Sequence, residues 1–186
     1  LEEEVIQIAS MPLMHQPGER FSYGLSTNVL GRLIELVSGV SLDTYLRKNI
    51  FRPLGMKDTY FYLPENKSAR LVKMAFRNAQ NQLEDFSSPL FNINYPLLTN
   101  SRYYSAIGGL VSTVSDLGNF LICLLQEGEF SGRRIIGKEI LQQFWTNQLG
   151  SKNFIFGGIP SSNNFGLGIG LTTKAGQKMK IGRAHV

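Results

Sequence analysis

The stretch from Pro17 to Thr59 constrains the fold more than any other part of the chain, because it carries start and stop signals for two consecutive helices. Ser26 or Thr27 can cap the first helix, and Gly39 is placed to end it. Apolar residues recur between these signals at the spacing of one helix face, namely Val29, Leu30, Leu33, Ile34 and Val37. These signals therefore predict a helix with an apolar face.

A second helix is predicted directly after the first. Ser41 can cap it, and Pro53 must end it because proline has no backbone N–H to donate. Its apolar positions are Leu42, Tyr45, Leu46 and Ile50. A helix is also expected over residues 1–9, and the Pro-Gly pair in residues 15–18 predicts a turn.

The remainder of the chain changes from an irregular region to helices and then to strands. Residues 57–107 hold scattered aromatic residues and three prolines, Pro64, Pro89 and Pro96, which predicts short strands and a long connection. The stretch 113–116 is similar to a capping box with Asp in the place of Glu. The helix after it is expected to end at Gly128 and to bury Leu117, Phe120, Leu121, Leu124 and Leu125.

The last part of the chain combines one more helix with strands. A helix is predicted from Gly137 to Trp145, and a strand is predicted from Phe165 to Thr173. The turn-forming stretch 174–176 then predicts a hairpin into a second strand.

In this order, the segments resemble the serine β-lactamase-like hydrolases, which include class C β-lactamases, D,D-peptidases, esterases and aminopeptidases. The resemblance begins with Tyr23 after the Pro-Gly turn, continues with a helix ending Ser38-Gly39, and reaches Phe-x-Pro-Leu-Gly-Met at 51–56. Three later segments also match in order: 108–116, 144–149 and 165–168. The resemblance covers roughly residues 13–171.

The resemblance implies the α+β class and a partial β-lactamase/transpeptidase-like fold, in which a sheet flanked by helices packs on a mainly helical region. Residues 1–180 would supply mostly the helical region plus strands of the later antiparallel sheet, and this domain would lack both ends. The last six residues, 181–186, resemble the translation of a sequencing-library adapter. They are expected to be a non-native tail and are excluded from the fold argument.

The resemblance also implies catalysis through an acyl-serine, with Tyr23 as the catalytic residue in this chain. In the family, the oxygen of this tyrosine faces the nucleophilic serine and relays protons to the leaving group. No serine here has Lys three residues later, so a Ser-x-x-Lys motif is expected before Leu1 in a longer protein. A Lys-Thr-Gly-type element is expected after the end, because the stretch 174–176 reads as a hairpin turn. The chain alone is therefore expected to be an inactive internal fragment.

Leu25 departs from the family pattern, because many β-lactamases and peptidases have Asn there to bind the amide side chain of the substrate. Leucine offers neither donor nor acceptor. The resemblance therefore points to the esterase-like members, with a small-molecule ester or amide as substrate. Asn28 is expected to face along the helix and is not assigned to this role.

Two functions remain open from the residues. The first is a serine hydrolase acting on an ester or amide. The alternative is a non-catalytic binding or regulatory relative of the penicillin-binding fold. A Ser-x-x-Lys motif in the full reading frame would favour the enzyme, and its replacement would favour the binding protein.

Other kinds of site find little support in the sequence. His15 is the only histidine outside the suspected tail and is expected to be a turn residue, and no His/Cys/Asp/Glu cluster has metal-ligand spacing, so neither a metal nor a cofactor is expected. Cys123 lies between apolar residues and is expected to be a buried thiol. The pair Gly108-Gly109 lacks the residues of a P-loop and is expected to allow close backbone packing.

Charge and hydropathy exclude two classes of partner. The net charge is +5, but basic residues never cluster into the stripe that a nucleic-acid groove needs. No apolar run approaches the roughly 18 residues needed to cross a bilayer. We therefore expect no nucleic-acid partner and no membrane segment within these residues.

Overall fold

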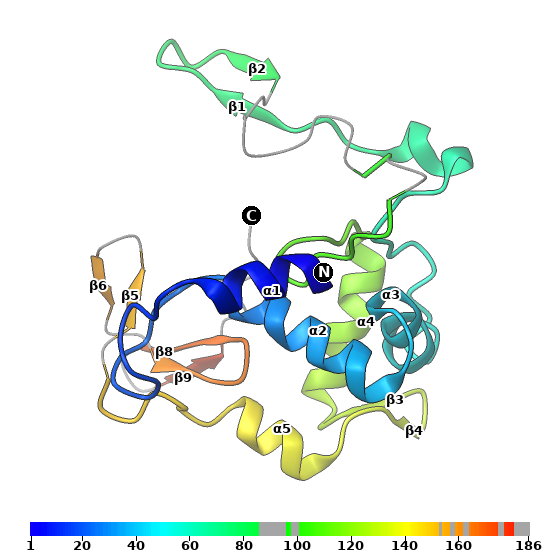
Figure 1. Ribbon diagram of the computed structural model, residues 1–186. Helices are drawn as coiled ribbons and strands as arrows, with labels where there is room; N and C mark the ends of the chain where they lie inside the picture. Colours follow the sequence, from blue (N-terminus) through cyan, green and yellow to red (C-terminus); the bar gives the residue numbers. More distant parts are fainter. Residues whose placement is uncertain are drawn as a thin grey trace.

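The computed structural model describes residues 1–85, 96–97, 101–152, 154–156, 159–161, 164–174 and 177–180, and for 154–156, 159–161, 172–174 and 177–180 it describes the backbone alone. The helices in these residues are α1 (Glu2–Ser10), α2 (Ser26–Ser38), α3 (Leu42–Leu46), the π-helix η1 (Arg47–Phe51), the 3-10 helix η2 (Glu65–Arg70), α4 (Val114–Leu125) and α5 (Lys138–Phe144). In the view of Figure 1, α1 lies beside α2, and α5 lies on the opposite side of α2 from α1.

The strands form small antiparallel sheets. Three are two-stranded: β1 (Ala75–Arg77) with β2 (Leu83–Asp85), β3 (Glu129–Phe130) with β4 (Arg133–Arg134), and β5 (Phe154–Phe156) with β6 (Ile159–Ser161). The fourth has three strands in the order β7 (Asn164–Phe165), β8 (Gly170–Lys174) and β9 (Gln177–Lys180). The predicted α+β class is confirmed.

The helix boundaries follow most of the predicted signals. Gly39 ends α2 in the left-handed conformation, at φ 69°. The N-cap of α2 is Leu25, whose side chain makes no capping hydrogen bond. The expectation that Ser26 or Thr27 would be the N-cap is therefore wrong. The hydroxyl of Ser41 accepts from the backbone N–H of Thr44 at 3.3 Å, as predicted for α3. The helix continues as η1 up to Phe51, just before proline.

The apolar face of α2 is largely exposed. Val37 is 81% exposed, and Leu30 and Leu33 are each more than half exposed. The buried positions of α2 are Asn28 and Gly31. A Cβ on Gly31 would lie 2.9 Å from the Cβ of Ala106, so α2 turns its small and polar side toward residues 105–107. Polar contacts of Asn28, described below, select this face.

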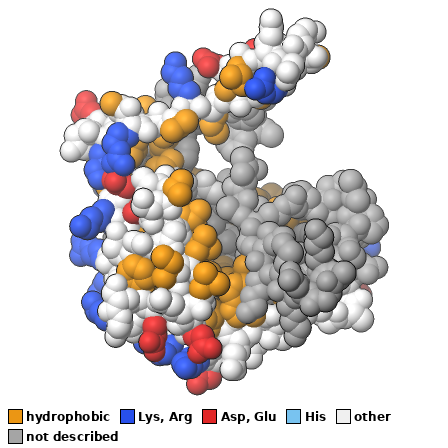
Figure 2. Space-filling model, turned by 180° about the vertical axis from the view of Figure 1, so that it is seen from behind, with side chains coloured by type: hydrophobic (Ala, Val, Ile, Leu, Met, Phe, Trp, Pro, Cys, Tyr) orange, Lys and Arg blue, Asp and Glu red, His pale blue; other side chains and the backbone are white. Residues whose placement is uncertain are grey.

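The burial of α4 is also shifted from the prediction. Its buried residues are Asp116, Cys123 and Leu124, whereas Leu117, Leu121 and Leu125 are exposed. The buried residues are spaced by seven and eight positions, so they share one helix face, and Asp116 on that face contacts residues 58–59. The side of the molecule opposite the view of Figure 1 carries a band of hydrophobic side chains (Figure 2).

The core is built from helices, from the segment after η1, from the segment after α5 and from the turn between β7 and β8. Its buried hydrophobic residues are Leu42, Phe51, Leu54, Tyr60, Phe61, Cys123, Leu124, Leu141, Leu149 and Ile169. Cys123 has no exposed surface, which confirms the predicted buried thiol. The β1–β2 hairpin is exposed along both strands and projects away from the helices (Figure 1).

The C-terminal strands correct one boundary. A turn closed by the hydrogen bond from Gly166 N–H to the Ile169 carbonyl, at 2.8 Å, breaks the predicted strand 165–173 into β7 and β8. The second predicted strand is β9, which pairs with β8 in the register Lys174 to Gln177. Residues 175–176 between them, and the suspected tail 181–186, lie outside the described residues. Among the described residues, no helix has both the length and the apolar character to cross a membrane.

Candidate functional site

Tyr23 lies in the loop between α1 and α2, two residues before the cap of α2. Its side chain is 39% exposed. Tyr23 therefore lies outside the buried core.

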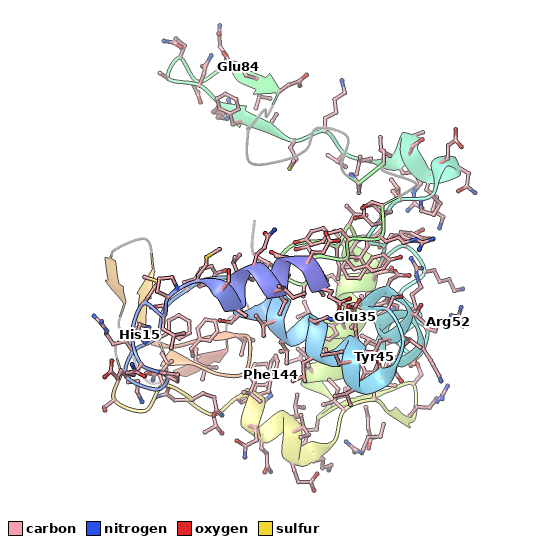
Figure 3. The ribbon with its side chains drawn as sticks, in the orientation of Figure 1. His15, Glu35, Tyr45, Arg52, Glu84 and Phe144 are labelled. Carbon is pink, nitrogen blue, oxygen red and sulfur yellow. The ribbon has the colours of Figure 1, made fainter. Side chains whose placement is uncertain are left out.

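The loop that carries Tyr23 is closed by His15. The Nε2 of His15 lies 2.8 Å from the hydroxyl of Ser22, and its Nδ1 lies 3.0 Å from the carbonyl of Gln16. The backbone N–H of Glu19 donates to the same carbonyl at 3.2 Å, which confirms the turn predicted over residues 15–18. His15, labelled in Figure 3, therefore belongs to the turn and also reaches the residue before Tyr23. No sequence pattern marks this contact between residues seven positions apart.

A second contact fixes the other neighbour of Ser22. The ring of Phe21 packs against that of Phe165 in β7, with centroids 5.4 Å apart. Phe165 begins the segment 165–168, which carries part of the family resemblance. The structure therefore brings the tyrosine loop and this distant segment together.

Segment 165–168 in turn rests on α5. The carbonyl of Phe165 accepts from the backbone of Gln148 at 2.7 Å, and the carbonyl of Phe144 accepts from that of Leu167 at 3.3 Å. A Cβ on Gly166 would lie 2.0 Å from the Phe144 carbonyl, so only glycine fits this approach. Three segments that carry the family resemblance thus meet: 21–23, 144–149 and 165–168.

Leu25 stands at the surface of the same loop. Its side chain is 46% exposed, and its backbone carbonyl accepts from the N–H of Asn28 at 2.9 Å in the first turn of α2. An apolar side chain is therefore presented two residues from Tyr23. A substrate that touches both would meet one hydroxyl and one hydrocarbon surface.

Asn28 is a buried hydrogen-bonding centre, so the expectation that it faces along the helix is wrong. Its amide nitrogen donates to both carboxylate oxygens of Glu4 at 2.9 Å and to the hydroxyl of Tyr103 at 3.2 Å. Its amide oxygen accepts from the backbone N–H groups of Ala106 at 2.7 Å and Ile107 at 3.2 Å. With both ends of its amide engaged inside the protein, Asn28 joins α1, α2 and residues 103–107.

Tyr103 shares this environment. Its hydroxyl donates to the Glu4 carboxylate at 2.8 Å. Burial, followed by this hydrogen bond, raises the pKa of Tyr103 above its ordinary value. Tyr103 therefore stays a neutral phenol that supports the packing of α1.

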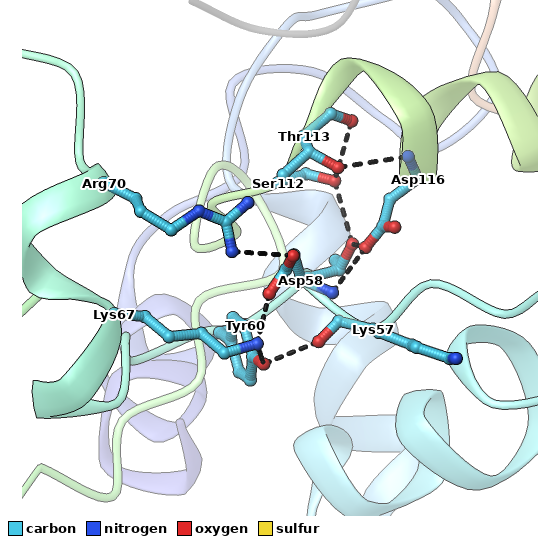
Figure 4. Close-up of polar contacts among 9 residues, drawn as sticks. Lys57, Asp58, Tyr60, Lys67, Arg70, Ser112, Thr113 and Asp116 are labelled. Atoms are coloured by element: carbon cyan, nitrogen blue, oxygen red, sulfur yellow. Dashed lines mark hydrogen bonds and ion pairs between the residues drawn. The ribbon is translucent and has the colours of Figure 1, made fainter.

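A second polar cluster joins the start of α4 to the segment after η1, and we call it the Asp58–Asp116 cluster (Figure 4). The buried carboxylate of Asp116 accepts from the backbone N–H of Asp58 at 2.7 Å and from the hydroxyl of Thr59 at 2.8 Å. Thr59 also contacts the hydroxyl of Ser112 at 2.8 Å. The hydroxyl of Thr113 accepts from the Asp116 N–H at 3.2 Å, which confirms half of the predicted capping box. The Asp116 side chain serves residues 58–59 instead of completing the box.

The carboxylate of Asp58 faces cations on η2. It pairs with Lys67, and with Arg70 at 2.8 Å. Hydrogen bonds first from Lys67 and then from Arg70 lower the pKa of Asp58 below its usual value. Lys67 also donates to the hydroxyl of Tyr60 at 2.8 Å. The carboxylate of Asp58 is thus paired with two cations of η2, and this pairing within the protein fits a structural role.

Close backbone packing completes this junction. Tyr60 and Val111 exchange backbone hydrogen bonds at 2.9 and 2.8 Å. A Cβ on Gly109 would lie 2.4 Å from the Ser105 carbonyl and 3.0 Å from the ring of Phe61, which confirms the predicted close approach. Gly108 has open space around its Cα and is not part of it.

No further reactive group stands out in the described part of the chain. Burial raises the pKa of the Cys123 thiol, which makes the thiolate less accessible. Among the described residues, no group of three or more His, Cys, Asp or Glu side chains is placed to hold a metal ion. The candidate site is therefore the loop of Tyr23 and Leu25, supported by His15 and Phe21.

The chain is similar to a known protein family, to individual proteins and to solved structures. The family model described as Beta-lactamase matches residues 2–184. A protein of Mycobacterium tuberculosis is 30% identical over 171 residues, which make up 89% of this chain. A lovastatin esterase of Penicillium rubens is 39% identical over 72 residues, which make up 38% of this chain and 18% of the esterase.

A solved structure also matches most of the chain. An octameric penicillin-binding protein homologue from Pyrococcus abyssi superposes with a TM-score of 0.63 at 27% identity over 91% of this chain. This likeness confirms the fold class expected from the resemblance. The chain spans 41% of the length of the M. tuberculosis protein and 35% of the P. abyssi chain.

Proposed function

We propose that this chain, which belongs to the β-lactamase family, acts as part of a serine hydrolase or acyltransferase in which Tyr23 relays protons. The family comprises serine-type hydrolases and acyltransferases that act on small esters or amides. The observation that carries the proposal is the placement of Tyr23. It is exposed on a loop that His15 closes and that Phe21 fixes against segment 165–168.

The proposed chemistry is acyl transfer in two steps. A serine oxygen attacks the carbonyl carbon of the substrate, its proton passes through the Tyr23 oxygen to the leaving group, and an acyl-serine forms. Water or an acceptor alcohol then attacks the acyl-serine and releases the acyl group. A free phenol has a pKa of about 10, so Tyr23 needs neighbouring cations to favour the phenolate. We propose that a Ser-x-x-Lys motif elsewhere in the full-length protein supplies both the nucleophile and such a cation.

The proposed substrates are esters rather than β-lactams. Leu25 presents hydrocarbon where an amide of a β-lactam side chain would need a partner. An unpaired buried polar group costs about 1–3 kcal/mol, or roughly 5- to 150-fold in specificity. The lovastatin esterase of P. rubens, similar over part of the chain, supports an ester substrate.

The second candidate function is a binding or regulatory relative without catalysis. Leu25 favours it, because the side chain replaces a polar contact that the hydrolases use. The two candidates differ in covalent chemistry. Only the hydrolase forms an acyl-serine.

The experiment uses the full-length protein, meaning the whole reading frame that encodes this chain. A fluorophosphonate probe, followed by peptide mass spectrometry, should label one serine followed three residues later by Lys. Residues 1–186 alone should show no labelling and no ester turnover. A full-length protein that resists the probe and hydrolyses no p-nitrophenyl ester would instead establish the binding relative.

The substrate preference is tested separately. In the full-length protein, kcat/KM for a p-nitrophenyl ester should exceed that for a chromogenic cephalosporin. Leu25→Asn should shift this ratio toward the cephalosporin by roughly 5- to 150-fold. A native preference for cephalosporin, or an unchanged ratio in Leu25→Asn, would disprove the role of Leu25.

A further inference from the structure

We infer that His15 is a positioning residue for Tyr23, acting through the hydroxyl of Ser22; this inference rests on the proposed function. Ser22 is the residue directly before Tyr23, and the His15 ring reaches it from seven residues earlier, at 2.8 Å. The hydrogen bond closes the loop into a ring of residues 15–22. The hydrogen bond thereby fixes Ser22, the residue whose backbone leads directly into Tyr23.

The tautomer of His15 follows from its partners. A carbonyl oxygen only accepts, so Nδ1, which lies 3.0 Å from the Gln16 carbonyl, carries the ring hydrogen. In the neutral ring Nε2 is then the acceptor, and the Ser22 hydroxyl donates to it. The backbone carbonyl of Gln16 therefore orients the imidazole, and the imidazole orients Ser22.

The turn beneath the ring restricts it further. The N–H of Gln16 donates to the Glu19 carboxylate at 3.2 Å, and the N–H of Glu19 donates to the Gln16 carbonyl at 3.2 Å. The carbonyl that orients His15 is thus itself fixed. This arrangement explains why a half-buried histidine in a surface turn makes a defined contact rather than pointing into solvent.

Phe21 gives the loop a second fixed point on the opposite neighbour of Ser22. Its ring lies 5.4 Å from that of Phe165 in β7, so an aromatic contact and a hydrogen bond hold adjacent residues. Two adjacent fixed residues define the direction in which the chain enters Tyr23. Placement of a catalytic group within a few tenths of an ångström strongly affects the rate, and a 1 Å displacement can cost about 100-fold.

The alternative is that Ser22 is a nucleophile and His15 its base, because a serine hydroxyl that donates to a histidine is also the arrangement of an activated nucleophile. The geometry favours positioning. The described contacts of His15 end at a backbone carbonyl, and the Glu19 carboxylate is bonded to the Gln16 N–H. The test therefore includes labelling of Ser22.

The experiment is a double-mutant cycle in the full-length protein. His15→Ala, Ser22→Ala and the double variant are compared with Tyr23→Phe and with Lys73→Ala, an exposed residue outside the loop. We expect kcat for a p-nitrophenyl ester to fall about 10- to 100-fold in either single variant, with KM nearly unchanged. The double variant should lose no more than a single variant, because each change breaks the same hydrogen bond. Lys73→Ala should match the native protein.

Conservative variants separate positioning from general loss of structure. His15→Gln can place a polar atom near the position of Nε2 and should restore much of kcat, whereas His15→Asn reaches only the position of Nδ1 and should not. The melting temperatures of all these variants should agree within a few degrees. Equal rescue by both variants would overturn the inference.

The remaining outcomes distinguish this inference from the proposed function. If Tyr23→Phe is inactive while His15→Ala keeps the native kcat, the positioning role is disproved and the proposed function stands. If Tyr23→Phe keeps the native kcat, the proposed role of Tyr23 fails, and the positioning role fails with it. Fluorophosphonate labelling at Ser22 would show a nucleophile there and would also overturn the positioning role.

Discussion

The Asp58–Asp116 cluster and the Tyr23 loop both join segments that resemble the same family, yet they are built in opposite ways. The Asp116 carboxylate and Thr59 are buried and hydrogen-bonded to each other. Tyr23 and Leu25 are exposed, and the described contacts that fix their loop are at Phe21 and Ser22. Segments of similar family likeness are therefore buried and hydrogen-bonded in one region and exposed in the other, where we propose that the chemistry takes place.

The difference has an energetic basis. A buried acceptor with hydrogen-bonded donors is costly to disturb, because each orphaned group costs about 1–3 kcal/mol. Exposed regions open at lower cost than buried ones, and functional loops are drawn from such regions. Substitutions in the cluster should therefore change stability, whereas substitutions in the loop should change rate. The predictions below test this division.

The largest expected effect is the loss of activity on removing the phenol of Tyr23. In the full-length protein, Tyr23→Phe should lower kcat/KM for a p-nitrophenyl ester by about 100- to 10,000-fold, because a positioned proton relay contributes that much. Its melting temperature should stay close to the native one, since Tyr23 lies outside the buried core and is 39% exposed. An active Tyr23→Phe enzyme would show that the phenol of Tyr23 is not catalytic. The proposed contrast between a stabilising cluster and a catalytic loop would then be wrong.

The next effect lies in the cluster. Asp116→Ala should lower the free energy of unfolding by about 2–4 kcal/mol, because the Asp58 N–H and the Thr59 hydroxyl lose a charged acceptor. Asp116→Asn is the matched control and should lose less, since it keeps one acceptor oxygen. Chemical denaturation measures both. If Asp116→Asn and Asp116→Ala lose the same free energy of unfolding, the stabilisation comes from the charge of Asp116 rather than from its acceptor oxygen.

A smaller effect is expected where the loop's support meets α5. Gly166→Ala should cost about 1–3 kcal/mol, because its Cβ would lie 2.0 Å from the Phe144 carbonyl and something must shift. Gly108→Ala is the control, since a Cβ there meets nothing within 4 Å. Thermal unfolding of both variants provides the measurement. If ester turnover by Gly166→Ala falls more than its stability predicts, the support and the loop are coupled.

The smallest effect concerns the ion pairs of Asp58. Its folded-state pKa is lowered, so the pairs with Lys67 and Arg70 stabilise the protein above the ordinary pKa of 3.8 and lose this contribution as the pH falls through the folded pKa. Asp58→Asn should therefore flatten the acid side of a plot of melting temperature against pH. The effect should shrink in high salt because the pairs are partly exposed. Identical acid profiles for the two proteins would show that these pairs do not stabilise the fold.

Local signals in the sequence predicted the helix ends well and the buried faces poorly. Ser41, Gly39 and Thr113 act within one turn of the backbone, so their roles follow from neighbouring residues. The burial of Asn28 depends on Glu4 and on residues 103–107, and these partners lie at least 24 positions away. A helical pattern alone cannot rank a polar face with distant partners above an apolar one.

The candidate site divides in the same way. Tyr23 was found because it stands in an ordered series of segments, and its exposure agrees with that reading. The contacts of His15 with Ser22 and of Phe21 with Phe165 arise from how the loop folds back and from how β7 packs. Neither contact leaves a periodic or spaced pattern in the sequence. Support of a functional residue is therefore harder to predict than the residue itself.

Because Cys123 is buried, the rate at which its thiol reacts with a reagent measures how often the core opens. It is the only cysteine in the sequence, and its thiol has no exposed surface. A disulfide reagent can react only while α4 lifts from its neighbours, so the labelling rate divided by that of an unfolded control gives the fraction of time spent open. Each substitution in the Asp58–Asp116 cluster then becomes readable as a change in that rate, under native conditions and without denaturant.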